Sequence, residues 1–170
     1  MDVYVDIIPK ILPGAIVTIQ LLVASSCLAL IIAFIAGLGR VSRYGIVRKL
    51  TSVYVELFRG TSLLVQMFFI FFALPAFGFQ FSPFLAGVVA LGLNYGAYGS
   101  EIVRGAILAI PNGQTEASIA LNMTRWQRMR LVIIPQAVRM MLPGFGNTSI
   151  ELLKGTSLVS LITLTDLTYK

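Results

Sequence analysis

The chain has 170 residues, of which 57% are hydrophobic and only 12% charged, against about 25% charged residues in a typical soluble domain. This composition is typical of a membrane protein, and the length provides a single domain. Because the chain has one cysteine and no histidine, a disulfide framework, the usual Cys/His zinc sites and a Ser-His or Cys-His nucleophile pair are excluded.

The net charge of +6 would suggest a nucleic-acid partner in a soluble protein. Here the basic residues instead gather in two blocks, residues 40–49 and 125–139, that stand between long uncharged runs. This distribution is typical of membrane topology, so no nucleic acid is expected. The N-terminus carries Asp2 and Asp6 and lacks the basic region of a secretory signal peptide, so its apolar segment is expected to be retained.

The first predicted span lies in residues 11–39, which contain no charged residue and would form a helix longer than the roughly 30 Å of bilayer hydrocarbon. The next uncharged run, residues 60–100, is too long for one span and is interrupted by Pro75, Gly78 and Pro83, which break helices. Two spans joined by a short turn are therefore predicted there, and a more polar span follows. These three spans are predicted over residues 53–74, 83–109 and 136–154.

The loops between these spans predict their orientation. The loop at residues 40–49 carries basic residues and no acid, and the segment 112–135 carries arginines against the single acid Glu116. The positive-inside rule places both loops in the cytoplasm, so the N-terminus and the turn at residues 75–83 are expected outside. The last apolar segment, residues 155–164, is too short to cross on its own.

Small residues recur at four-residue spacing in the first and third predicted spans. Such faces let helices approach closely in lipid, so we expect them to pack helices within the chain or between two subunits. The residues are Ala33 and Gly37 in the first span and Gly92, Gly96 and Ser100 in the third.

The cytoplasmic segment 111–127 is more patterned than a connecting loop and predicts two short helices. Asn112 can cap the first helix, and Glu116 lies near its positively polarised start. Asn122 can end this helix, because asparagine tolerates the left-handed backbone conformation.

Thr124 followed by Gln127 has the spacing of a capping box and predicts the start of the second helix, which Pro135 separates from the next span. The exposed alanine, methionine and tryptophan positions of this helical hairpin suggest docking to another protein. Trp126, which lies among arginines, could serve either as an interfacial anchor or as a docking contact.

Residues of this hairpin resemble the EAA loop of ABC importer permeases, whose usual form is Glu-Ala-Ala, three residues, Gly and later Ile-x-Leu-Pro. Ser118 stands where the family has Ala, and Asn122 stands where it has Gly. Both departures preserve the small size or the backbone geometry. The matching residues are Glu116-Ala117-Ser118, Asn122 and Ile133-Ile134-Pro135.

Further motifs narrow the resemblance to the permeases of polar amino acid importers and extend it over almost the whole chain. They are Glu56-Leu57-Phe58-Arg59-Gly60-Thr61 with Leu63-Leu64-Val65-Gln66, Asn94-Tyr95-Gly96-Ala97-Tyr98 with Glu101-Ile102-Val103-Arg104-Gly105-Ala106, and Leu153-Lys154-Gly155-Thr156-Ser157-Leu158. Since family members usually have five spans, the chain is expected to end before the last one.

The resemblance implies an all-α, polytopic membrane protein with the type I ABC importer permease fold. It implies one permease domain, residues 1–170, with four spans and a cytoplasmic coupling segment at residues 112–134. The expected location is the bacterial inner membrane, with multiple passes and the N-terminus outside.

The same resemblance implies an ATP-driven importer for a polar amino acid or related zwitterion. Its expected partners are ABC ATPases, a second identical or related permease subunit, an extracytoplasmic substrate-binding protein and membrane lipid. The chain has no phosphate-binding loop, so ATP hydrolysis is assigned to another chain, and neither enzyme activity nor a cofactor is expected here. The ATPase-docking residues implied are Glu116, Ala117, Ser118, Leu121, Asn122, Met123 and Trp126.

Charged and polar residues inside the predicted spans are candidates for function, because they are costly in lipid. Oppositely charged residues three positions apart can pair or reach toward a membrane face. These pairs are Glu56 with Arg59, Glu101 with Arg104, and Glu151 with Lys154.

Asn94, Tyr98 and Glu101 recur at helical spacing and form a polar stripe on one face of the third span. The stripe, with Gln66 as a weaker candidate, predicts a substrate path in which the carboxylate meets a substrate cation. Interhelical hydrogen bonding and gating are the alternatives.

Two other classes of membrane protein fit the sequence less well than the importer permease. A non-transport scaffold or a channel-like subunit would have no need of a capped cytoplasmic hairpin, and the sequence has no pore-lining repeat. A secondary transporter is disfavoured because no inverted internal repeat is present. The identity of the amino acid is not encoded in any motif described above.

Overall fold

The computed structural model describes residues 2–164, with side chains described between Gly14 and Ile162. Within this range the backbone is helical apart from short connections. The helices are α1 (Asp2–Val41), α2 (Gly45–Gly60), α3 (Leu63–Phe68), α4 (Pro83–Leu108), α5 (Asn112–Ala120), α6 (Arg125–Arg128), α7 (Ile134–Thr156) and α8 (Val159–Leu164). A π-helical turn (Phe69–Ala73) and a 3₁₀ turn (Leu74–Phe77) follow α3, and a second π turn (Met129–Ile133) joins α6 to α7.

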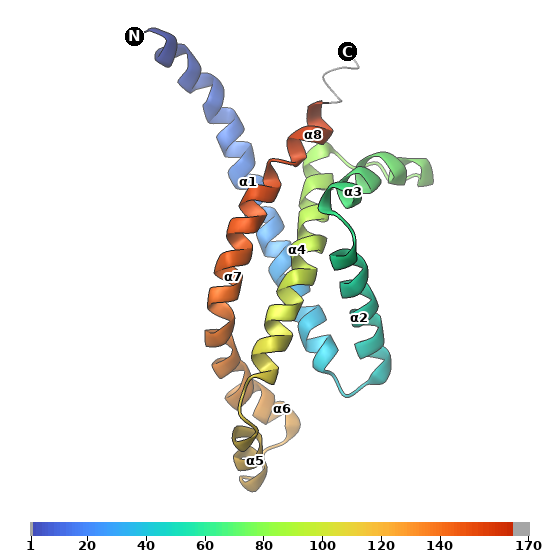
Figure 1. Cartoon of the computed structure of the whole chain (residues 1–170), viewed down its shortest axis with the longest axis vertical. Helices are drawn as coiled ribbons and strands as arrows, with labels where there is room; N and C mark the ends of the chain where they lie inside the picture. Colours follow the sequence, from blue (N-terminus) through green and yellow to red (C-terminus); the bar gives the residue numbers. More distant parts are fainter. Residues whose placement is uncertain (1, 165–170) are drawn as a thin grey trace.

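Helix α4 is the centre of the molecule, with α1 and α7 along it on one side and α2 on the other (Figure 1). The close approach of α1 to α4 depends on glycine: a Cβ atom added to Gly92 would lie 2.5 Å from Leu28, and one added to Gly96 would lie 2.7 Å from Ile32. The predicted small-residue faces therefore pack helices within the chain, as interfaces in lipid generally do.

Three of the four predicted spans correspond to continuous helices. Helix α1 contains the first, α4 reproduces the third to within one residue, and α7 contains the fourth. Judged by length and apolarity, Gly14–Val41 is the one helix of the described residues that could cross a membrane on its own. The short helix α8 lies in the segment that was predicted to be too short to span.

The span predicted over residues 53–74 is not one continuous helix. Helices α2 and α3 meet at a break and are bent by 103°, and only as a bent pair do they satisfy the length and apolarity expected of a span. Thr61 and Ser62 have extended backbone conformations. Side chains of α3 and α4 hydrogen-bond to the end of α2 at this break, which stabilises it in place of a continuous helix.

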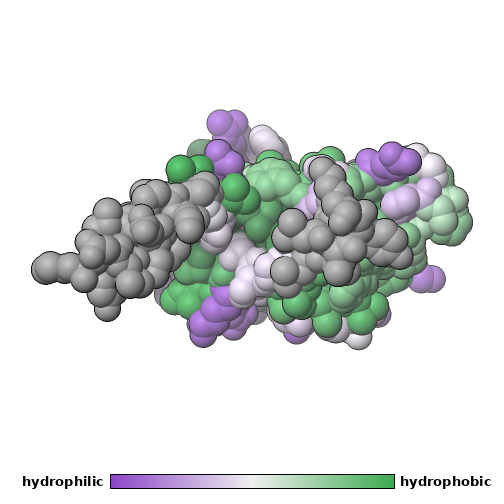
Figure 2. Space-filling model, turned by 90° about the horizontal axis from the view of Figure 1, so that it is seen from above, coloured by the Kyte–Doolittle hydropathy of each residue, from purple (hydrophilic) through white to green (hydrophobic). Residues whose placement is uncertain are grey.

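Apolar side chains cover much of the outer surface. Seen from above the view of Figure 1, green apolar patches dominate the coloured surface, with hydrophilic groups at its margins (Figure 2). Among the exposed residues are Ile31, Ile35, Val65 and Leu142. An outer surface of this kind is expected where a protein contacts lipid or neighbouring subunits.

Candidate functional site

One glutamate on α4 contacts the ends of two other helices. Oε1 of Glu101 lies 2.6 Å from Nη1 of Arg40 at the end of α1 and 2.8 Å from Nη1 of Arg59 at the end of α2. Its other oxygen, Oε2, lies 3.6 Å from Nη1 of Arg104, one turn along α4. The predicted pair of Glu101 with Arg104 is thus present but is the longest of the three.

The other two predicted pairs, Glu56 with Arg59 and Glu151 with Lys154, do not form salt bridges. In the part of the chain that the structure describes, every salt bridge converges on Glu101. Arg59 reaches across to this residue and not back to Glu56, because the end of α2 packs against α4. The carboxylate of Glu151 instead accepts a hydrogen bond from Asn147, at 3.2 Å.

This charged cluster, defined as Arg40, Arg59, Glu101 and Arg104, carries two positive charges in excess. The guanidinium of Arg59 also lies over the ring of Tyr98, 5.3 Å from its centre. Arg40 is only 12% exposed, whereas Arg59 and Arg104 are 42% and 41% exposed. Of these two, Arg59 lies beside Tyr98 of the predicted polar stripe, so it is the member best placed to receive an anionic group there. Guanidinium groups bind carboxylates in a two-pronged geometry.

Gln66 and Asn94 are buried and bind each other at the break between α2 and α3. The side-chain amide of Asn94 donates to Oε1 of Gln66 at 3.1 Å, and both side-chain amides donate to the carbonyl of Phe58. Gln66 also donates to Oγ1 of Thr61 at 2.6 Å. Because the last carbonyls of a helix lack partners within it, these two side chains cap α2 and hold α3 against α4.

The predicted polar stripe on α4 is therefore divided into two parts. Asn94 contacts Gln66, whereas Tyr98 and Glu101 contact Arg59. The interhelical hydrogen bonding considered as an alternative is present at Asn94. Sequence reasoning missed Arg40, since its position at the end of an apolar run was interpreted only as a sign of orientation.

The hairpin α5–α6 lies at the end of the bundle opposite α8 (Figure 1). The prediction that Asn112 caps α5 is wrong, because Pro111 occupies the flanking position and Asn112 is the first helical residue. Asn122 does end the helix as predicted, with a left-handed φ of 55°. The amides of Asn122 and Met123 donate to the carbonyls of Ile119 and Ser118, which is the Schellman arrangement.

The second helix of the hairpin begins at the predicted capping box. The backbone N–H of Gln127 donates to Oγ1 of Thr124, and the backbone N–H of Thr124 donates to Oε1 of Gln127. However, Pro135 does not separate this helix from the next span. The π turn accommodates the missing N–H of Pro135, so α6 and α7 form one continuous helical segment.

Most of the predicted docking residues are exposed on this hairpin. Leu121 is 75% and Trp126 69% exposed, and Glu116, Ala117 and Asn122 are exposed as well, whereas Met123 is half-buried. Ser118 differs: its side chain is buried and donates to the carbonyl of Gln114 at 2.6 Å. Ser118 thus supports the hairpin from within and offers no surface to a partner.

The side chains of the described residues form no set of acidic, cysteine or histidine groups able to hold a metal ion. The arrangement consists of a positively charged cluster among helix ends and an exposed helical hairpin joined rigidly to α7. Such an arrangement can bind a small anionic group and can respond to contact with another protein.

Comparison with known proteins gives consistent matches. Residues 29–170 match the family described as the inner membrane component of binding-protein-dependent transport systems. A probable amino-acid ABC transporter permease of Sinorhizobium fredii is 50% identical over 162 residues, covering 92% of this chain and 68% of that protein. The L-cystine transport system permease of Bacillus subtilis is 44% identical over 159 residues, covering 94% of this chain and 68% of that protein.

A solved structure has the same fold. The crystal structure of an amino acid ABC transporter with histidines superposes with a TM-score of 0.86 at 36% sequence identity, covering 98% of this chain and 83% of that one.

Proposed function

Because the chain belongs to the family of inner membrane components of binding-protein-dependent transport systems, we propose that it forms, with a second permease subunit, the path of a polar amino acid across the membrane. It is a permease subunit of an amino acid ABC importer and not an enzyme itself. It therefore acts with ATPase and substrate-binding partners. The all-helical type I permease fold predicted from the sequence is confirmed.

The geometry of the hairpin α5–α6 is the main support for coupling between the ATPase and the transport path. It is exposed, its helix ends are fixed by hydrogen bonds, and its second helix continues into α7 without a break. We propose that Glu116, Ala117, Leu121, Asn122, Met123 and Trp126 contact the ATPase. Closure of the ATPases would then move α7 as a lever and open the path alternately to each side.

We place the substrate path beside Gln66, Asn94, Tyr98 and Glu101. Glu101 is already neutralised by arginines, which disfavours the contact with a substrate cation expected from the sequence. The excess positive charge instead favours the carboxylate of a zwitterionic amino acid, held by Arg59. The relatives named above for L-cystine and for amino acids in general support an amino acid as the substrate class.

Co-purification tests the coupling proposal. Glu116 is exposed and has no ion-pair partner in the described part of the chain, so its carboxylate is free to bind a basic group or backbone amides of the ATPase. Replacing Glu116 by alanine should weaken ATPase retention by roughly 2 kcal/mol, or about 30-fold in affinity, the typical value of a hydrogen bond to a charged group. Glu56→Ala, which removes an exposed acid on α2, is the matched control.

Wild type and the Glu56 variant should retain the ATPase through purification, as identified by mass spectrometry, and the Glu116 variant should lose it. Equal retention in all three proteins, with normal coupling of hydrolysis to uptake, would show that Glu116 is not a docking residue.

We also propose that the hairpin and the α1–α2 loop face the cytoplasm and that the N-terminus faces outward, with multiple passes through the membrane. In a variant lacking Cys27, single cysteines at the exposed positions Ile46 and Phe77 should react with a membrane-impermeant maleimide from opposite sides. Position 46 should be labelled in inverted vesicles and position 77 in intact cells. Labelling of both from one side would contradict this orientation.

A further inference from the structure

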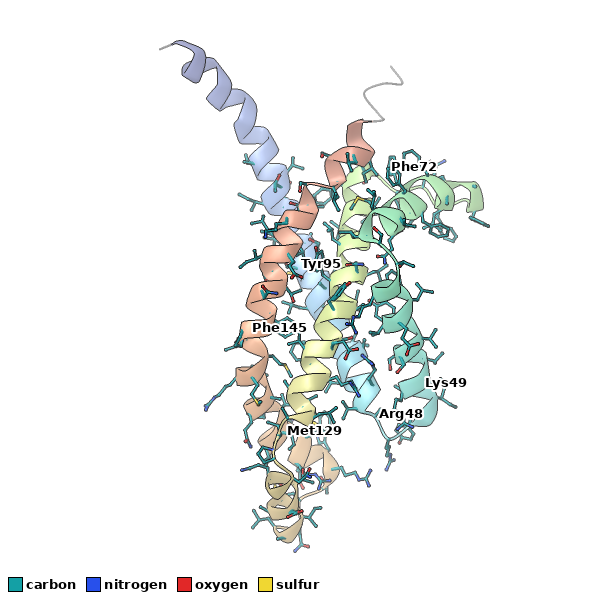
Figure 3. The ribbon with its side chains drawn as sticks, in the orientation of Figure 1. Arg48, Lys49, Phe72, Tyr95, Met129 and Phe145 are labelled. Atoms are coloured by element: carbon teal, nitrogen blue, oxygen red, sulfur yellow. The ribbon has the colours of Figure 1, made fainter. Side chains whose placement is uncertain are left out.

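A pocket of about 490 Å³ lies between the end of α1, the α1–α2 loop and the start of the α6–α7 segment. Arg43, Arg125 and Arg128 line it together with the apolar side chains of Leu38, Val41 and Met129. In Figure 3, Met129 lies toward the hairpin end of the bundle, roughly level with Arg48 and Lys49 on α2. The pocket therefore lies where the positive-inside rule places the cytoplasmic boundary of the membrane.

Among the described residues, the three arginines of the pocket have no acidic partner. Within the described residues all salt bridges go to Glu101, and none involves Arg43, Arg125 or Arg128. Arg43 is held by Tyr44, whose hydroxyl accepts its hydrogen bond at 2.6 Å and whose ring lies 4.7 Å from the guanidinium carbon. Nη1 of Arg128 is buried without a hydrogen-bond partner. A buried charged donor of this kind is costly unless an acceptor binds it.

The apolar wall of the pocket continues along the membrane-facing side of α1. Ile31, Ile35 and Leu38 follow one another at helical spacing, and Ile31 and Ile35 are exposed. A ligand with an anionic head and a long apolar tail therefore fits this surface. The arginines would bind the head, and the continuous apolar surface would contact the tail. A free phosphate ion would leave that surface unused, and an acidic protein surface would do so as well.

We propose that this pocket binds the headgroup of an anionic phospholipid, with its phosphate held by Arg125 and Arg128 and supported by Arg43. Arginine clusters at the cytoplasmic boundary of a membrane attract anionic lipids, and a phosphate accepts paired hydrogen bonds from a guanidinium. The site lies apart from the charged cluster at Glu101, and the proposal does not depend on which solute is carried.

Native mass spectrometry of the purified full chain in detergent tests the proposal by titration with dioleoyl phosphatidylglycerol and, separately, dioleoyl phosphatidylethanolamine. Wild type should bind the anionic lipid more tightly than the zwitterionic one. The double variant Arg125→Gln/Arg128→Gln should bind phosphatidylglycerol roughly tenfold more weakly or worse. Arg48→Gln/Lys49→Gln removes the same charge from exposed positions outside the pocket and should bind it as wild type does.

Two further variants distinguish loss of lipid binding at the pocket from loss of binding caused by unfolding. Arg43→Gln changes an exposed loop residue and should weaken binding of phosphatidylglycerol several-fold without lowering the melting temperature. Arg125→Lys/Arg128→Lys keeps the charge but loses the paired guanidinium hydrogen bonds, so it should bind phosphatidylglycerol more weakly than wild type and more tightly than the double glutamine variant.

The proposal is overturned if both lipids bind equally or if both double glutamine variants lose binding to the same extent. It is also overturned if millimolar inorganic phosphate displaces the lipid fully, which would identify a free-anion site. Unchanged binding of phosphatidylglycerol in the Arg125/Arg128 glutamine variant overturns the proposal as well, and loss of ATPase retention in that variant would then assign the pocket to the partner protein.

Discussion

Replacing Glu101 by glutamine is expected to destabilise the protein by about 3 kcal/mol and to abolish uptake. The substitution leaves Arg40, Arg59 and Arg104 together without a carboxylate. Removing one partner of a buried ion pair costs roughly 3 to 5 kcal/mol, and the lower value applies because the cluster is partly exposed. The melting temperature and the yield of monodisperse protein in detergent measure the loss of stability.

Two variants serve as controls for Glu101→Gln. Arg104→Gln removes the member that lies 3.6 Å away and is 41% exposed, so it should cost less than about 1 kcal/mol. Glu151→Gln removes a carboxylate that has no salt bridge in the described part of the chain and should change stability little. A Glu101 variant with wild-type yield and melting temperature would show that the cluster does not hold the helices together, and selective loss of uptake would then leave only a role on the substrate path.

Replacing Gly96 by leucine is expected to separate α1 from α4 and to cost about 3 kcal/mol or more, the upper part of the range for overpacking. A Cβ atom at Gly96 would lie 2.7 Å from Ile32 and 3.3 Å from the backbone oxygen of Ala29. Because Cβ of Ile32 would also lie only 2.8 Å away, a change of rotamer at Ile32 does not relieve the clash, and α1 must move away from α4. Thermal unfolding in detergent, followed by far-UV circular dichroism, measures the effect.

Gly105 provides the matched control for this substitution. It lies on the same helix, and a Cβ atom there would have no neighbour within 4 Å. Gly105→Leu should therefore unfold within a few degrees of wild type. If both leucine variants unfold alike, helix propensity and not close packing decides the effect at Gly96.

The features predicted well from the sequence are those with a local cause. The left-handed residue at Asn122 and the capping box at Thr124 depend on neighbouring residues, and the glycines of α4 mark a packing face through their spacing. The helices of the first, third and fourth predicted spans follow from runs of apolar residues and the prolines and glycines between them.

The features missed depend on contacts between distant parts of the chain. The predicted partner of Arg59 is Glu56, one turn away on the same helix. The observed partner is Glu101, which lies 42 residues away on α4. The break before α3 is stabilised by Asn94 from another helix, which no local pattern reveals. The continuity through Pro135 was missed because a π turn before a proline has no simple sequence signature.

ATP-driven uptake is the measurement that bears most directly on the assignment of this chain as an importer permease. The complex purified with its ATPase and binding protein is reconstituted in proteoliposomes, and entry of radiolabelled L-cystine, L-glutamine, L-arginine and L-histidine is followed with ATP or a non-hydrolysable analogue on the ATPase side. Accumulation of at least one of these amino acids against its gradient is expected, only with ATP and only with the binding protein. Equal entry with the analogue, stopping at equilibrium, would contradict the assignment and indicate a passive pore.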